Sequence, residues 1–271
     1  MDDMMQVHVL ASGSTGNAVY IAMGDKRVLV DAGISCRRIT GGLRELGVDP
    51  SQLDAVLITH EHIDHVKGLE VFTRRYRLPV HARPGVWGSG GVFATLPRDC
   101  RHELGERLEL GRVQIECVPI SHDAVDPVGF VFRCGDMQMA SITDVGCING
   151  TLISALAGCD IMVLESNHDV TMLKEGPYPP FLKKRISGNK GHLSNLECGR
   201  LLTMAEKHPH RTPHVFLAHM SQQNNVPALA RATVERELAH SGCRPGEDMI
   251  LHLTAAQACA SLYWNPAKGE C

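Results

Sequence analysis

The residues best suited to chemistry lie in the run Thr-His-Glu-His-Ile-Asp-His at positions 59–65, which holds three imidazoles and acidic groups within six residues. A solvated histidine-rich loop explains this cluster poorly, because the rings repel one another when protonated and each needs a partner. Neutral imidazole is the commonest metal ligand, and mixed nitrogen and carboxylate ligands suit Zn²⁺, Mn²⁺ or Fe²⁺. His60 and His62 can face one ion. Asp64 and His65, about one turn further along the chain, can face a second.

Three further candidate ligands stand at or just after the ends of apolar runs that we expect to be strands. They are His122, Asp144 and His219. Because binding sites of α/β folds gather at the carboxyl ends of strands, we expect these side chains to meet at one edge of a sheet. Asp144 has two oxygens and can bridge two ions about 3.5–4 Å apart.

The elements that position these residues are predicted from alternating or continuous apolar runs and from helical spacing. Strands and strand–helix units recur in both halves, which predicts two sheets packed face to face with helices outside: an α/β, four-layer fold in a single domain over 1–271. The segment 169–191 is rich in proline, glycine and lysine and is predicted to be a loop-like insertion. We expect strands at 7–10, 18–23, 27–31, 55–59, 78–82, 113–120, 129–134, 137–144, 160–166, 214–219 and 248–253, and helices at 35–46, 64–76, 151–157, 193–207 and 226–241.

The composition is that of a globular protein: 271 residues, 44% hydrophobic, 21% charged, with a formal net charge of −3. This length and apolar share exclude wholesale disorder. The sequence contains no run of 18 apolar residues, so it predicts no membrane span. The acidic start MDD does not resemble an export signal. The ten cysteines have no CxxC spacing, so we expect reduced thiols and a cytoplasmic protein.

The candidate ligands together form a pattern that is similar to a known family. Asp31 in LVDAG, the HxHxDH motif at 60–65, His122, Asp144 and His219 resemble the metallo-β-lactamase superfamily over roughly residues 7–253. The resemblance implies an αββα sandwich with two divalent metal ions, zinc or manganese with iron as a third candidate, and a supporting role for Asp31. It also implies that His60, His62 and His122 bind one ion, that Asp64, His65 and His219 bind the other, and that Asp144 bridges them.

Longer strings resemble one branch of this superfamily, the YycJ/WalJ-like proteins. They are SGSTGN at 12–17, SHDAVDPVGF at 121–130, LESNHD at 164–169, GHLSN at 191–195 and LAHMSQQNN at 217–225. The resemblance implies a bacterial DNA exonuclease that prefers double-stranded DNA and digests it from 5′ to 3′, using a hydroxide that bridges the metals. Nothing in the sequence implies an obligate protein partner or a membrane.

The catalytic residues that we expect are Asp64, Glu165 and His192. Glu165 and His192 occupy places between Asp144 and His219 that resemble those of a glutamate and a histidine in tRNase Z-type phosphodiesterases. A histidine held by a carboxylate can protonate the leaving alkoxide. The alternative for GHLSN is a helix N-terminus, with Ser194 or Asn195 as the cap.

Substrate binding is expected where positive charge borders the metal site. Residues 172–191 contain five lysines and arginines against one glutamate, and Lys183, Lys184 and Arg185 are the candidates for contacts with the phosphate backbone. His168 is a further candidate, and a locally hydrogen-bonded loop histidine is the alternative. Two other functions stay open: hydrolysis of small phosphodiesters such as cyclic nucleotides, and a metal-binding regulatory module without turnover.

Overall fold

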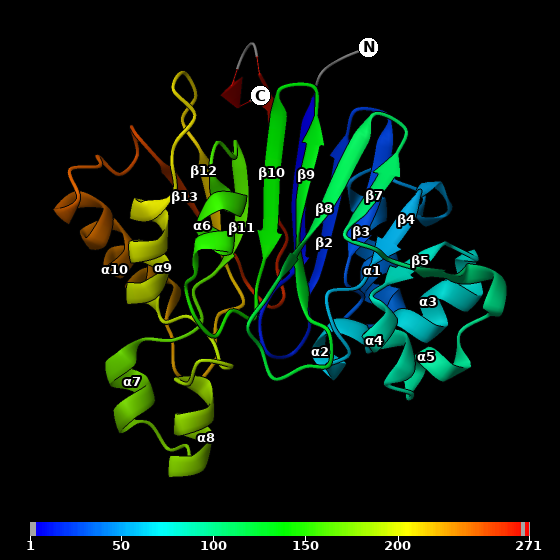
Figure 1. Cartoon of the computed structure of the whole chain (residues 1–271), viewed down its shortest axis with the longest axis horizontal. Helices are drawn as coiled ribbons and strands as arrows, with labels where there is room; N and C mark the ends of the chain where they lie inside the picture. The colour runs from blue at the N-terminus through cyan, green and yellow to red at the C-terminus, as the bar shows by residue number, and fades with distance from the viewer. Residues whose placement is uncertain (1–3, 267–268, 271) are drawn as a thin grey trace.

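Two β-sheets packed face to face form the centre of the molecule, in a computed structural model that describes residues 4–266 and 269–270 (Figure 1). The first sheet has the order β15-β14-β1-β2-β3-β4-β5-β6 and is antiparallel from β15 to β3 and parallel from β3 to β6. Its strands are β1 (Met5–Ala11), β2 (Ala18–Met23), β3 (Lys26–Val30), β4 (Ala55–Leu57), β5 (Val80–Ala82), β6 (Arg101–Glu103), β14 (Ala260–Asn265) and β15 (Gly269–Glu270).

The second sheet has the order β13-β12-β11-β10-β9-β8-β7. Its strands β10 to β13 run parallel, and β7, β8 and β9 pair antiparallel. The strands are β7 (Arg107–Leu110), β8 (Val113–Pro119), β9 (Val128–Cys134), β10 (Met137–Ile142), β11 (Ile161–Glu165), β12 (His214–Ala218) and β13 (Ile250–Leu253).

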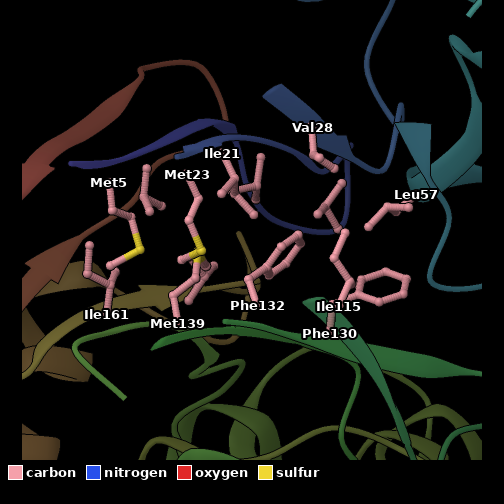
Figure 2. Close-up of a cluster of buried hydrophobic side chains, with 14 of the residues drawn as sticks. Met5, Ile21, Met23, Val28, Leu57, Ile115, Phe130, Phe132, Met139 and Ile161 are labelled. Atoms are coloured by element: carbon pink, nitrogen blue, oxygen red, sulfur yellow. The ribbon is translucent and has the colours of Figure 1, made fainter. Parts of the chain in front are cut away.

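The space between the sheets is filled by apolar side chains from both inner faces (Figure 2). Met23 and Ile21 of the first sheet point toward Phe132 and Met139 of the second, and all four are at most 1% exposed. Burying a side chain of this size contributes about 1.5–3 kcal/mol. This shared core holds the two sheets in one relative position, and the site at their common edge depends on that position.

Helices cover the outer face of each sheet, so the predicted four-layer αββα sandwich is confirmed. On the first sheet, Leu43 of α1 and Phe72 of α3 are fully buried in one apolar cluster. On the second, Leu201 of α9 and Val234 of α10 are fully buried in another. The helices are α1 (Cys36–Glu45), α2 (Ile63–Val66), α3 (Leu69–Tyr76), α4 (Pro84–Gly88), α5 (Val92–Thr95), α6 (Gly150–Leu156), α7 (Val170–Glu175), α8 (Pro180–Ile186), α9 (Asn195–Met204) and α10 (Pro227–His240).

Two of the predicted elements were wrong. The single helix expected over 64–76 is broken into α2 and α3 near Gly68, which packs so tightly on the Ile34 carbonyl that a side chain there would clash. The predicted loop at 169–191 contains α7 and α8, which lie below α9 in Figure 1. Asp169 caps α7 by accepting hydrogen bonds from two backbone N–H groups, and Pro180 stands in the first turn of α8, where proline is favourable.

Several short elements were not predicted: α4, α5, β6, β7, β14 and β15. β6 has only three residues and reads Arg-His-Glu, so it carries no apolar pattern. Its place at the edge of the first sheet is decided by pairing with β5 rather than by its own sequence.

Candidate metal centre

The candidate ligands converge at one edge of the two sheets, the lower edge in Figure 1, because the carboxyl ends of several strands point there. His60 and His62 lie in the connection from β4 to α2, and Asp64 and His65 lie in α2 itself. Each of the other three follows the end of a strand of the second sheet: His122 follows β8, Asp144 follows β10 and His219 follows β12. The structure thus brings all seven predicted ligands together.

The donor atoms of these side chains form overlapping groups within 4.8 Å of one another. One group combines His60, His62 and His122, and a second combines Asp64, His65 and His219. Asp144 lies between the two groups. Its Oδ2 is 3.3 Å from His65 Nε2, and its Oδ1 is 3.5 Å from His219 Nε2 and 3.8 Å from His122 Nε2.

Several inward-facing atoms of the cluster have no hydrogen-bond partner among the described residues. These buried atoms are His60 Nε2, His122 Nε2 and Asp144 Oδ2. A buried polar atom without a partner costs free energy, and a divalent ion ligated by these atoms would offset that cost. The donor set of imidazole and carboxylate therefore fits the metal chemistry expected from the sequence.

Three of the five ligand histidines are held by a hydrogen bond to a carboxylate or a backbone carbonyl on the ring nitrogen that faces away from the other ligands. His65 Nδ1 donates to Asp31 Oδ2 at 2.7 Å, and His219 Nδ1 donates to Glu165 Oε1 at 2.8 Å. His122 Nδ1 donates to the Gly191 carbonyl at 3.1 Å. In all three rings Nε2 then faces the other ligands, the arrangement that orients metal-binding histidines.

The carboxylates and imidazoles perturb one another strongly. Burial would lower the pKa of His219, but the neighbouring Asp144, Asp64 and Glu165 raise it to about 10. Burial likewise opposes charge on Glu165, yet His192 and His219 lower the pKa of this carboxyl to about 2. A metal ion binds neutral imidazole. A cation entering here must therefore displace the proton on His219 that the neighbouring carboxylates stabilise.

The backbone at the site is locally strained. Asp31, Asp144 and His219 have φ values of 61°, 61° and 52°, and they are three of the four non-glycine residues with positive φ in the described chain. This left-handed region is unfavourable for residues with a Cβ and persists where the surroundings enforce it, typically at functional sites. The three residues follow the ends of β3, β10 and β12, at the edge where the ligands gather.

Glu165 and His192, the predicted catalytic pair, are in direct contact. Glu165 Oε1 lies 2.9 Å from His192 Nδ1, and the other carboxylate oxygen accepts from the Val145 and Leu193 backbone N–H groups. His192 Nδ1 is also 3.6 Å from Asp144 Oδ1. The helix-cap explanation of GHLSN is correct as well, because Ser194 caps α9 with a capping box. His192 precedes the cap, and its side chain contacts Glu165 rather than the helix N-terminus.

The four predicted substrate-binding residues do not share one environment. His168 is 2% exposed and is paired with Ser194 in a short β-bridge. Lys183 and Lys184 lie on α8, where they line a cavity together with His168. Arg185 instead forms an ion pair with Asp123.

Two residues near the ligands were missed at the sequence level. Asn17 Nδ2 lies 3.1 Å from His65 Nε2 and 3.4 Å from Asp64 Oδ2. Asp123 Oδ1 lies 3.3 Å from His122 Nε2. The run SGSTGN contains Asn17, and Asp123 is adjacent to His122, so closer attention to the neighbours of motif residues would have found both.

Comparisons with known proteins agree with this geometry. Residues 26–220 match the model of the β-lactamase superfamily domain. The metallo-β-lactamase fold protein YhfI from Bacillus subtilis superposes with a TM-score of 0.70 at 16% identity, covering 96% of this chain and 100% of that one. The chain therefore belongs to the metallo-β-lactamase superfamily.

Relatives within the superfamily align over nearly the whole chain. Exodeoxyribonuclease YycJ from Bacillus anthracis is 36% identical over 249 residues, which is 91% of this chain and 94% of that protein. Exodeoxyribonuclease WalJ from Streptococcus pneumoniae is 34% identical over 259 residues, 94% of this chain and 96% of that protein. The predicted resemblance to the YycJ/WalJ-like branch is confirmed. None of the helices in the described part of the chain is long and apolar enough to cross a membrane.

Proposed function

We propose that this protein is a metal-dependent exodeoxyribonuclease. The observation that carries the proposal is the contact between Glu165 and His192 directly beside the seven clustered ligands, in a chain more than a third identical to an exodeoxyribonuclease. Digestion from 5′ to 3′ and the preference for double-stranded DNA stay predictions from the resemblance, as does the cytoplasmic location. One domain over 1–271 with an insertion at 169–191 is likewise our proposal.

Two divalent ions, zinc or manganese, with iron as a third candidate, are proposed to occupy the site. Bound ions would activate water and neutralise charge on the phosphoryl oxygens. The buried Nε2 and carboxylate atoms without partners support this assignment. The proposed ligands are His60, His62 and His122 for one ion, Asp64, His65 and His219 for the other, and Asp144 for both.

His192 is the proposed general acid. Its Nδ1 faces Glu165, so Nε2 is the nitrogen available to protonate the oxygen of the leaving nucleotide. Glu165 fixes the ring orientation and stabilises the imidazolium form, while its second oxygen is held by two backbone N–H groups. Asp64 is also proposed to act in catalysis, through its role as a ligand; its Oδ2 lies 3.4 Å from Asn17 Nδ2.

Phosphate contacts are proposed for Lys183, Lys184 and Arg185 on α8. His168, which lines a cavity together with Lys183 and Lys184, is a further proposed substrate-binding residue. The segment carrying these residues touches the metal ligands: Gly191 accepts from His122, and Ser121 Oγ donates to the Asn189 carbonyl. DNA bound along α8 would therefore lie next to the reacting centre.

The test is digestion of end-labelled, 5′-phosphorylated linear duplex DNA with Mn²⁺ or Zn²⁺, beside the Asp144→Ala variant. Stepwise loss of nucleotides by the wild type alone is expected, and the position of the label reveals the direction. Intact DNA together with cleavage of a generic phosphodiester would refute the proposal in favour of a small phosphodiester substrate. Metal binding without turnover of either substrate would indicate a regulatory module.

A further inference from the structure

A cavity of about 470 Å³ lies between the insertion and α9, next to the metal centre but separate from it. Its position is set by the chain that follows β11: His168 forms a β-bridge with Ser194, and the Asn195 N–H donates to the His168 carbonyl. Ser194 lines the cavity, and His192, two residues earlier in the chain, contacts Glu165 beside the metal ligands. The volume lies within the usual range of ligand pockets, about 300–1,000 Å³.

The inner wall of the cavity is mostly apolar. Val170, Leu173 and Leu196 supply the apolar surface. His168 also lines the cavity and is 2% exposed. An apolar wall of this kind is suited to a flat, partly apolar group such as a nucleotide base.

The rim of the cavity is strongly positive. Lys174, Lys183, Lys184 and Arg200 line it, against one acid, Glu197. Glu197 is already engaged, because its carboxylate accepts from the Ser194 N–H and hydroxyl in the capping box of α9. Lys183 Nζ donates to the Lys174 carbonyl at 2.7 Å, which links α8 to α7 across the rim. The net field at the mouth therefore favours an anion such as a phosphate group.

We propose that this cavity binds one nucleotide of the DNA substrate, with the base against the apolar wall and His168, and the phosphate at the lysine and arginine rim. The inference rests on the proposed exonuclease function, since that function supplies a ligand with both a flat base and a phosphate. The nucleotide comes either from the strand being digested or from the released product. Because Ser194 lines the cavity and His192 is two residues away in the chain, occupation of the cavity would hold the DNA close to the reacting centre.

Two variants probe the cavity with little risk to folding. Val170 is 51% exposed, and Val170→Trp places a large side chain into the cavity from its surface. Arg200→Ala removes one rim charge. The matched control is Arg236→Ala, because Arg200 and Arg236 both lie on outer helices, are 56% and 57% exposed, and pair with Glu237 at 3.8 and 3.9 Å, while only Arg200 lines the cavity.

Two binding measurements distinguish the sources of the nucleotide. Isothermal titration calorimetry with deoxyadenosine 5′-monophosphate measures binding of the product, and fluorescence anisotropy with a labelled phosphorothioate duplex measures binding of the strand. Val170→Trp should weaken at least one of them tenfold or more. Arg200→Ala should reduce the slope of log K against log salt for the duplex by about 1, whereas Arg236→Ala should leave it unchanged.

The outcomes separate this inference from the proposed function. An effect on the duplex assigns the cavity to the strand, and an effect on the monophosphate alone assigns it to the product. A wild-type enzyme that digests DNA, with Val170→Trp and Arg200→Ala binding both probes normally, would overturn the inference and leave the proposed function standing. A wild type that leaves DNA intact would refute the proposed function, while monophosphate binding that is lost in Val170→Trp would still support a nucleotide site.

Discussion

Replacing Gly33 by alanine should displace Asp64 and thereby weaken metal binding. A Cβ at position 33 would lie 1.6 Å from the Asp64 carbonyl oxygen, and real Cβ contacts essentially never fall below 3.0 Å. Backbone at one of the two positions must therefore move by about 1.4 Å. The movement is resisted, because Gly33 donates to the Asn17 carbonyl at 2.8 Å while the Asn17 N–H donates to that same Asp64 oxygen, also at 2.8 Å.

The size of the effect follows from the narrow tolerance of metal coordination. Ligand distances hold to within about 0.2 Å, so a shift of more than 1 Å removes Asp64 from a coordination sphere. We expect metal affinity to fall at least 10–100-fold, the usual cost of disturbing residues that support ligands. Overpacking adds a loss of about 1–3 kcal/mol in the free energy of unfolding of the metal-free protein. Competition with a chromophoric chelator measures the affinity, and urea denaturation in chelator measures the stability.

Gly41→Ala is the matched control. Gly41 lies in α1, and a Cβ there has no heavy atom within 4 Å. Alanine should stabilise this helix by about 0.5–1 kcal/mol and leave the metal affinity unchanged. The two glycine substitutions should therefore act with opposite sign on stability. Wild-type metal affinity in Gly33→Ala would refute the reasoning that this close approach positions Asp64.

Four other predictions concern the same centre. Asp144→Ala should abolish turnover and lower the metal content measured by elemental analysis; full activity would exclude a bridging role. His192→Ala should lower kcat about 10²–10⁴-fold with metal content intact, and equal metal loss in both variants would remove His192 from the acid role. If the metal is present at about 1,000 times its Kd, chelation should lower the free energy of unfolding by about 4 kcal/mol, seen as a fall in Tm that excess metal reverses. Because the pKa of His219 is raised to about 10, protons compete with the metal below that pH. The apparent metal affinity should therefore rise between pH 6 and 9, about tenfold per pH unit for each proton displaced. A metal affinity that does not change with pH would contradict this coupling.

The fold class and the residues of the metal centre could be predicted from the sequence because both depend on local patterns. Apolar runs such as 214–219 mark buried strands, and the clustered histidines at 60–65 are too costly to occur together without a ligand. The predictions failed where a local pattern was weak or ambiguous. β6 carries no apolar alternation, and the prolines of the insertion were interpreted as a loop although Pro180 begins a helix.

The sequence by itself determined which side chains can ligate metal and on which strand ends they stand. The pairing of Glu165 with His192 was predicted, but only the tertiary structure decided the other partners: Glu165 also holds His219, Gly191 orients His122, and Gly33 sets the position of Asp64. These contacts join residues that lie 27 to 69 positions apart in the chain. No local periodicity encodes such a contact, because it arises when the shared core packs the two sheets together and brings the ends of their strands to one edge.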